Sequence, residues 1–175
     1  MSQTETKPIE EFKALVTEWR LDADFARQNF SNAAMAVVGA RQTGKTTFVE
    51  NMTKTTEYCV AIHDELFSDA KEPVQMLVRA KNGLSVYVKQ FWLDFHPKMR
   101  REFDYVVLVG ITDKRTIRRI WEQYDHLFDK KMRYNHFEEA IVEAQHAAPW
   151  TRVMIDVSLP VLQGVRPASL HWIKF

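Results

Sequence analysis

Eight consecutive residues carry a pattern suited to chemistry on phosphate groups. The pattern G-x-x-x-x-G-K-[ST] is matched at every constrained position by Gly39, Ala40, Arg41, Gln42, Thr43, Gly44, Lys45 and Thr46. Glycines let successive backbone N–H groups curl around an anion with no Cβ in the way. The lysine ammonium neutralises the β- and γ-phosphates, and the hydroxyl after it is a ligand for Mg²⁺. The run predicts a phosphate-binding loop for ATP, with Thr43 and Thr47 as supporting residues.

The residues on either side supply the context that such a loop requires. Ala33–Val38 is an apolar run of strand length that leads into Gly39. Thr46–Lys54 is expected to form a helix with Phe48, Val49 and Met52 inward. The N-terminus of that helix adds a partial positive charge where the phosphates would lie. A strand, the loop and a helix are therefore expected in that order.

A phosphate loop of this kind also needs a carboxylate at the end of a neighbouring strand, to hold the metal and activate water. Asp64 and Glu65 follow the apolar run YCVAI after one histidine, and we favour Asp64 as the metal ligand and Glu65 as the general base. Two alternatives remain open. Asp156 lies within VMIDV, and Asp94 follows VYVKQFWL.

Short apolar runs alternate with amphipathic stretches along the rest of the chain. Strands are expected at Tyr58–Ile62, Leu84–Val88, Tyr105–Val109 and Val153–Val157, and helices at Pro73–Arg79, Thr112–Phe128 and Asn135–Ala147. Continuously apolar strands that alternate with helices are typical of a mostly parallel sheet covered on both faces. We therefore predict an α/β fold, a three-layer P-loop NTPase core over residues 31–158.

The two ends of the chain are expected to lie outside this core. Pro8–Arg27 has apolar residues at helical spacing, so residues 1–30 are predicted to be an N-terminal helical extension. Residues 159–175 show no clear period and are predicted to be a C-terminal tail.

Composition limits the class of protein. The chain has 175 residues, 46% hydrophobic and 27% charged, which fits one soluble globular domain and excludes disorder. No apolar run is long enough to span a membrane, and the N-terminus lacks the order of a signal peptide. The single cysteine, Cys59, excludes an internal disulfide and fits an intracellular, reducing compartment. The six histidines lack metal-ligand spacing, so no zinc site is expected.

Residues 33–157 resemble the DNA-packaging ATPases of large double-stranded DNA viruses, the poxvirus-type branch of the FtsK–HerA superfamily. That family has an arginine, a serine-containing strand, a polar glutamine, a proline, paired arginines and a D-Y strand. The corresponding residues here are Arg79, Ser85, Gln90, Pro97, Arg100, Arg101 and the run FDYVVLV from Phe103. The later IRRIWEQYDHLF and VMID runs also match.

The resemblance implies an ATP-hydrolysing, Mg²⁺-dependent motor that moves double-stranded DNA, most plausibly a viral genome, into a capsid. It implies a homo-oligomeric ring, in the host cytoplasm or virion, with capsid or membrane proteins of the virion as further partners and no insertion into the membrane. Gln90 would sense the γ-phosphate or the attacking water. Arg79, Arg100 and Arg101 would be candidates for a charge that reaches a neighbouring subunit's nucleotide.

Two features keep other interpretations open. Only 19 residues separate Lys45 from Asp64, fewer than is usual in the family, so either the chain is a shortened member or Asp64-Glu65 is not the metal site. Arg115, Arg118 and Arg119 share a helix face that would meet DNA phosphates or pair with Glu122 and Asp125. The alternative functions are a small P-loop nucleotide or metabolite kinase and a shortened, non-hydrolysing nucleotide-binding module.

Overall fold

The apolar run Ala33–Val38 forms strand β2, in which all six side chains are buried. The computed structural model describes residues 16–56, 60–64, 77–147, 152–158, 163–164 and 166–174. Strands β4 (Leu84–Lys89) and β5 (Tyr105–Leu108) pair with β2 on its two sides, both parallel to it. Burial on both faces explains why these strands read as unbroken apolar runs.

Within the described ranges, seven strands form one sheet in the order β1-β7-β6-β5-β2-β4-β3. Strand β3 (Val60–Asp64) runs parallel to β4, whereas β6 (Arg152–Asp156) runs antiparallel to β5. Strand β7 (Ser169–Lys174) is antiparallel to β6 and parallel to β1 (Val16–Arg20). The predicted mostly parallel sheet is confirmed, with β6 as the strand that reverses direction.

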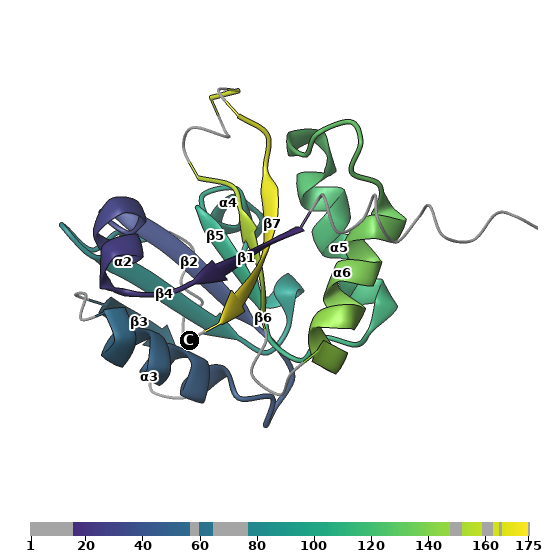
Figure 1. Ribbon diagram of the computed structural model, residues 1–175. Helices are drawn as coiled ribbons and strands as arrows, with labels where there is room; N and C mark the ends of the chain where they lie inside the picture. Colours follow the sequence, from purple (N-terminus) through teal and green to yellow (C-terminus); the bar gives the residue numbers. More distant parts are fainter. Residues whose placement is uncertain are drawn as a thin grey trace, which may run out of the picture.

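Helices cover both faces of the sheet (Figure 1). On one face lie α2 (Ala23–Asn29) and α3 (Lys45–Thr56), and α3 buries Phe48, Val49 and Met52 against the strands. On the other face lie α5 (Lys114–Tyr124) and α6 (Tyr134–Ala147). The short elements η2 (Trp92–Asp94), α4 (Pro97–Arg100) and η3 (Asp125–Leu127) complete the described helices. The three-layer α/β prediction is confirmed.

The single helix predicted over Pro8–Arg27 is wrong at Val16–Arg20, whereas its last residues, Ala23–Arg27, are helical. Val16–Arg20 is the edge strand β1, and a separate helix begins only at Ala23. The Trp19 ring stacks on His171 of β7, with centroids 3.3 Å apart, and Thr17 Oγ1 lies 2.5 Å from His171 Nδ1. These contacts join residues more than 150 positions apart in the chain. They stabilise a strand here although the spacing of the apolar residues fits a helix. The remainder of that prediction, residues 8–15, lies outside the described residues.

The C-terminal prediction also needs correction, because Ser169–Lys174 is strand β7 of the sheet rather than part of a tail outside the core. The strand is hard to recognise in the sequence because the polar residue His171, which is buried, interrupts the apolar pattern. Both terminal strands therefore belong to the same sheet as residues 31–158. The helix predicted at Pro73–Arg79 is not formed at residues 77–79, and its beginning lies outside the described residues.

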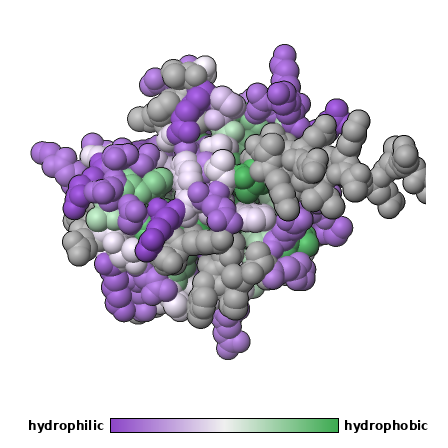
Figure 2. Space-filling view, viewed as in Figure 1, coloured by the Kyte–Doolittle hydropathy of each residue, from purple (hydrophilic) through white to green (hydrophobic). Residues whose placement is uncertain are grey.

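The face of the molecule in Figure 2 is mainly hydrophilic, with small hydrophobic patches between polar side chains. Among the helices that the structure describes, none is long and apolar enough to cross a lipid bilayer.

Candidate functional site

The phosphate-loop sequence lies between the end of β2 and the start of α3. Gly39 follows Val38, the last residue of β2, and α3 begins at Lys45. Strands β3, β4 and β5 are parallel to β2, so all four carboxyl ends meet at this edge of the sheet. Ligands of open parallel sheets bind beyond this edge. The predicted order of strand, loop and helix is confirmed.

The conformation of the loop requires its glycines. A Cβ on Gly39 would lie 2.0 Å from the carbonyl oxygen of Val109, which ends the neighbouring chain segment after β5. Gly44 has φ +87°, in the left-handed region that disfavours side chains. Gly110, outside the motif, also has positive φ, and a Cβ there would lie 2.8 Å from Thr43 Cγ2. The chain segment just after β5, residues 109–110, therefore packs closely against the loop.

The Lys45 side chain folds over the first residues of the loop. Its Nζ donates hydrogen bonds to the carbonyl oxygens of Gly39 at 2.7 Å and Ala40 at 2.6 Å. Thr43 Oγ1 donates to the same Ala40 oxygen at 2.9 Å. The first turn of α3 contains no acidic residue. A cation and a helix N-terminus thus lie together, which is the electrostatic arrangement that an anion requires.

The other predicted loop residues lie at the surface of this edge. Arg41, Gln42, Thr46 and Thr47 are at least partly exposed, and Thr43 is half-buried. Gln42 adopts positive φ (60°), which bends the loop between its two glycines. The Thr46 hydroxyl lies at the start of α3, where the sequence predicts a metal ligand.

Gln90 and Asp64 follow the loop along the edge of the sheet. The Gly39 N–H donates to the carbonyl oxygen of Lys89 at 3.3 Å, so Gln90 comes next to the first loop residue. Asp64 ends β3 opposite Val88 of β4. With strands about 4.8 Å apart, the backbones of β2 and β3 are separated by roughly 10 Å. Gln90 thus follows the end of β4, the strand between β2, which leads into the loop, and β3, which ends at Asp64. Glu65 lies outside the described residues, and so does the side chain of Asp64.

Asp156, the first alternative metal carboxylate, lies at the opposite edge of the sheet. It ends the antiparallel strand β6 opposite Tyr105, the first residue of β5. Its buried carboxylate accepts from Arg166 Nη2 at 2.6 Å and from the Ser158 N–H at 3.0 Å. The alternative that places the metal at Asp156 is therefore wrong. Asp94, the second alternative, is exposed and accepts from the Phe91 N–H at 3.2 Å in its own short turn.

The arginines singled out for contact with a neighbouring subunit have different surroundings. Arg79 pairs with the buried Asp104 and donates to the carbonyl oxygen of Glu102, at the edge away from the loop. Arg100 Nε donates to the Phe95 carbonyl oxygen at 2.9 Å, and burial lowers the pKa of its guanidinium. Arg101 is exposed. Arg79 is therefore a structural ion-pair partner in its own chain.

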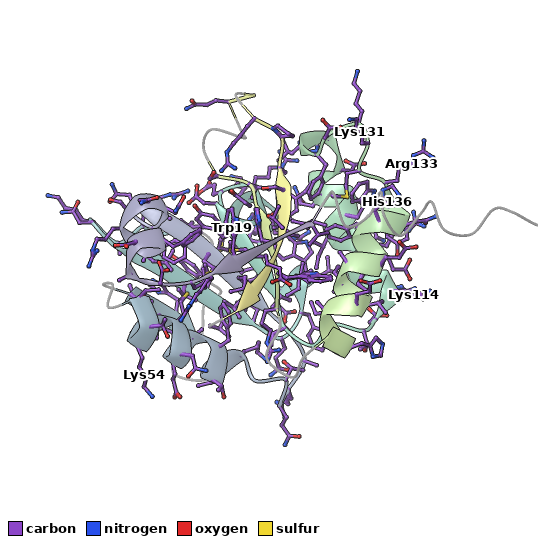
Figure 3. The ribbon with its side chains drawn as sticks, in the orientation of Figure 1. Trp19, Lys54, Lys114, Lys131, Arg133 and His136 are labelled. Carbon is purple, nitrogen blue, oxygen red and sulfur yellow. The ribbon has the colours of Figure 1, made fainter. Side chains whose placement is uncertain are left out.

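The basic helix face on α5 is only partly neutralised by its own chain. Arg119 pairs with Glu122 at 3.3 Å, and the Arg118 guanidinium lies 4.0 Å above the Tyr134 ring. Arg115 is exposed. The Asp125 carboxylate, the other expected partner, lies beside His126 at 3.7 Å. Figure 3 shows Lys114, Lys131 and Arg133 projecting outward on this side, away from Lys54 on α3.

Sequence reasoning missed Arg152, which reaches the loop region. Its Nη2 lies 3.4 Å from the position that a Cβ on Gly44 would occupy. The side chain is half-buried, and burial lowers its pKa. The only sequence signal is an arginine at the start of an apolar strand, and that pattern does not give the direction of the strand.

No protein-family model matches the chain, and no curated protein matches it by sequence. Among solved structures, the DNA-packaging ATPase B204 from Sulfolobus Turreted Icosahedral Virus is 9% identical, with a TM-score of 0.49, over 83% of this chain and 99% of that chain. The genome packaging NTPase B204 from Sulfolobus turreted icosahedral virus 2 in complex with sulfate is 10% identical, with a TM-score of 0.47, over 82% and 98% of the two chains. The same NTPase in complex with AMPPCP is 10% identical, with a TM-score of 0.42, over 80% of this chain and 97% of that chain. Because these TM-scores are below 0.5, we infer function from the loop, the sheet order and the sequence.

Proposed function

We propose that this chain is an ATPase that binds Mg²⁺ and ATP at residues 39–47 and uses hydrolysis to move double-stranded DNA. The observation that carries the nucleotide site is the loop itself. It joins β2 to α3 at the carboxyl edge of the parallel strands, and Lys45 Nζ lies within hydrogen-bond distance of two loop carbonyl oxygens. Backbone N–H groups, a lysine and a helix N-terminus at one place favour a polyphosphate ligand.

Each loop residue has a distinct role in this proposal. Lys45 neutralises the β- and γ-phosphates, while residues 39–44 and Thr47 surround the phosphate chain. Glu65 accepts the proton of a water that attacks the γ-phosphorus, and the bond to the β–γ bridging oxygen breaks to release ADP and phosphate. Gln90, which directly follows β4 between the loop and Asp64, senses the γ-phosphate or that water.

The oxygen donors at this edge fit a magnesium ion. Thr46 lies at the start of α3, and Asp64 ends β3 at the same edge. Mg²⁺ in phosphate sites is usually held by one or two carboxylates together with phosphate oxygens and water. No group of three His, Cys, Asp or Glu within the described ranges would hold a metal without phosphate. When bound, the ion would offset charge that develops on the phosphate oxygens.

The DNA partner rests on the sequence resemblance and on the basic side of the molecule. Residues 97–134 hold ten Lys or Arg against six Asp or Glu, and several of the cations project outward on the α5–α6 side. Phosphate contacts of this kind bind duplex DNA without regard to sequence. In a homo-oligomeric ring, Arg100 or Arg101 is the better candidate for a neighbouring subunit's nucleotide, because Arg79 is held by Asp104. Packaging of a viral genome, in the host cytoplasm or virion, is the most specific form of this proposal.

The same helix weakens the kinase alternative. Arg115, Arg118 and Arg119 lie on α5, whose Ile117 and Ile120 are fully buried in the core. A helix anchored in this way belongs to the layer that covers the sheet, whereas the lid of a kinase must open and close over its substrates.

The experiment is phosphate release from Mg²⁺ and ATP, with and without duplex DNA, by the wild-type chain and by Lys45→Ala. Stimulation by DNA that is lost in Lys45→Ala supports the motor. Turnover that requires a small hydroxyl or phosphate acceptor instead supports the kinase. Nucleotide binding without any turnover supports the non-hydrolysing module.

A further inference from the structure

Arg152 reaches the phosphate loop because β6 runs against the direction of its neighbour. In the β5–β6 pairing Val153 lies opposite Leu108, so Arg152 stands at the level of Val109. The N–H of Val109 donates to the carbonyl oxygen of Val38 at 2.8 Å, and its own carbonyl oxygen packs against Gly39. The antiparallel strand therefore starts at the edge where the parallel strands end.

The side chain of Arg152 lies on the same face of the sheet as α3. Met154, two residues further along the strand, packs in the core cluster that contains Phe48, Val49 and Met52 of α3. Side chains two residues apart on a strand point to one face. The guanidinium then extends to Gly44, where Nη2 lies 3.4 Å from the position that a Cβ on that glycine would take. The guanidinium thus lies beside Gly44, the residue that precedes Lys45 in the loop.

We propose that Arg152 binds the phosphate groups of the nucleotide within its own subunit, on the side of the loop opposite to Asp64. This inference rests on the proposed nucleotide site. An arginine is always protonated in a protein, and its planar group of N–H donors matches phosphate oxygens. Arg152 would supply the second cation of the site, in addition to Lys45.

The order of the strands identifies the phosphates that Arg152 contacts. The order β6-β5-β2-β4-β3 puts the loop in the middle, Arg152 on one side of it, and Gln90 with Asp64 on the other. The γ-phosphate and the attacking water belong on the side of Gln90 and Asp64. Arg152 therefore contacts the inner phosphates, which ATP and ADP share. It is a binding residue and takes no part in activating water.

The test measures the equilibrium dissociation constants of ATP and ADP for Arg152→Met and Arg152→Lys. Methionine keeps an unbranched, packing side chain without the charge, and lysine keeps the charge without the fork of donors. Loss of a hydrogen bond to a charged group predicts that Arg152→Met weakens both nucleotides by about 10- to 100-fold. Arg152→Lys should recover part of that loss.

Two controls separate this inference from the nucleotide site itself. Arg119→Ala removes an exposed arginine on α5 and should leave both dissociation constants unchanged. Lys45→Ala should abolish binding. If Lys45→Ala binds nucleotide normally, the proposed function fails. If Lys45→Ala loses binding but a folded Arg152→Met binds both nucleotides as tightly as wild type, the inference about Arg152 is wrong. A loss confined to ATP, with a collapse of kcat, would also overturn it. If Arg152→Met does not fold, Arg152→Lys decides by the same criteria.

Discussion

Gly110 and Thr43 lie against each other so closely that a Cβ on Gly110 would come within 2.8 Å of the Thr43 methyl carbon. Gly110 stands just beyond the end of β5, with φ +61°. Thr43 holds the loop by donating to the carbonyl oxygen of Ala40. The chain after β5 thus supports the phosphate loop from the side, although it contributes no residue to the motif.

Gly110→Ala should weaken nucleotide binding by more than it destabilises the fold. The added methyl group must displace Thr43 and the loop with it, so we expect roughly a tenfold rise in the dissociation constant of ADP. Gly164→Ala is the matched control, since Gly164 also has positive φ (+72°) but a Cβ there would meet nothing within 4 Å. Both variants incur a backbone cost of about 1 kcal/mol in urea unfolding. Equal ADP affinity in the two variants would contradict a role for the Gly110–Thr43 contact.

Glu65→Gln should separate binding from hydrolysis. The variant keeps its shape but loses the proton acceptor, so Mg²⁺ and ATP should stay bound while turnover falls by about a hundredfold or more. Asp156→Asn is the informative comparison, because Asp156 lies at the opposite edge and pairs with Arg166. It should lose stability and keep the turnover of the folded fraction. Normal turnover in Glu65→Gln would show that Glu65 is not the base.

Burial of His171 makes stability depend on pH. The residue is 4% exposed, and the Thr17 and Ser169 hydroxyls lie within hydrogen-bond distance of its two ring nitrogens. Burial lowers the pKa of His171 from 6.5 to about 4. Between these two pH values the unfolded chain binds a proton at His171 and the folded chain does not. Stability should therefore be complete above the unfolded pKa and fall by roughly 3 kcal/mol as the pH drops toward the folded one.

Urea unfolding of wild type and His171→Gln across this pH range checks the prediction. The variant should be less stable at neutral pH because it loses the stacking with Trp19, but its stability should vary less between the two pKa values. His126→Gln, at an exposed position on η3, controls for the loss of a histidine. A pH slope in His171→Gln as steep as in wild type would contradict the assignment.

Removing the charges of Arg115, Arg118 and Arg119 together should flatten the salt dependence of duplex DNA binding. Each lost phosphate contact lowers the slope of log K against log salt by about one unit. Since Arg119 already pairs with Glu122, we expect a change of about two units rather than about three. Removal of Arg20, Arg27 and Lys54, on β1, α2 and α3, controls for the loss of three positive charges. A triple variant that follows the parent's salt curve would place the DNA surface elsewhere.

The central strands of the fold were predictable because burial on both faces leaves a continuous apolar run. Ala33–Val38 is predicted and found with the same bounds, and the loop follows from local spacing alone. The edge strands were not predictable in this way. Val16–Arg20 carries two charged residues and fits a helical period as well as a strand, and only its distant partner β7 decides.

Strand direction explains the errors and omissions at the site. The sequence of Arg152–Asp156 indicates a strand but not its direction. From the sequence, Asp156 is therefore still an alternative to Asp64 as the metal ligand, and Arg152 is not identified as a residue of the site. Because β6 is antiparallel to β5, its first residue, Arg152, lies at the edge of the sheet that carries the loop, and its last residue, Asp156, lies at the opposite edge. Gly110 was missed for a related reason, since its closeness to Thr43 depends on how β5 lies beside β2.

The most direct measurement of the central claim is ATP affinity in wild type, Lys45→Ala and Lys54→Ala, with circular dichroism to confirm that each is folded. Lys45 and Lys54 lie toward the two ends of the same helix, so the pair holds composition and net charge constant. We predict that wild type and Lys54→Ala bind ATP equally and that Lys45→Ala loses about a hundredfold or more in affinity, since a charged hydrogen bond and the phosphate counter-charge are both removed. Equal ATP affinity in folded Lys45→Ala and Lys54→Ala would contradict a nucleotide site at this loop.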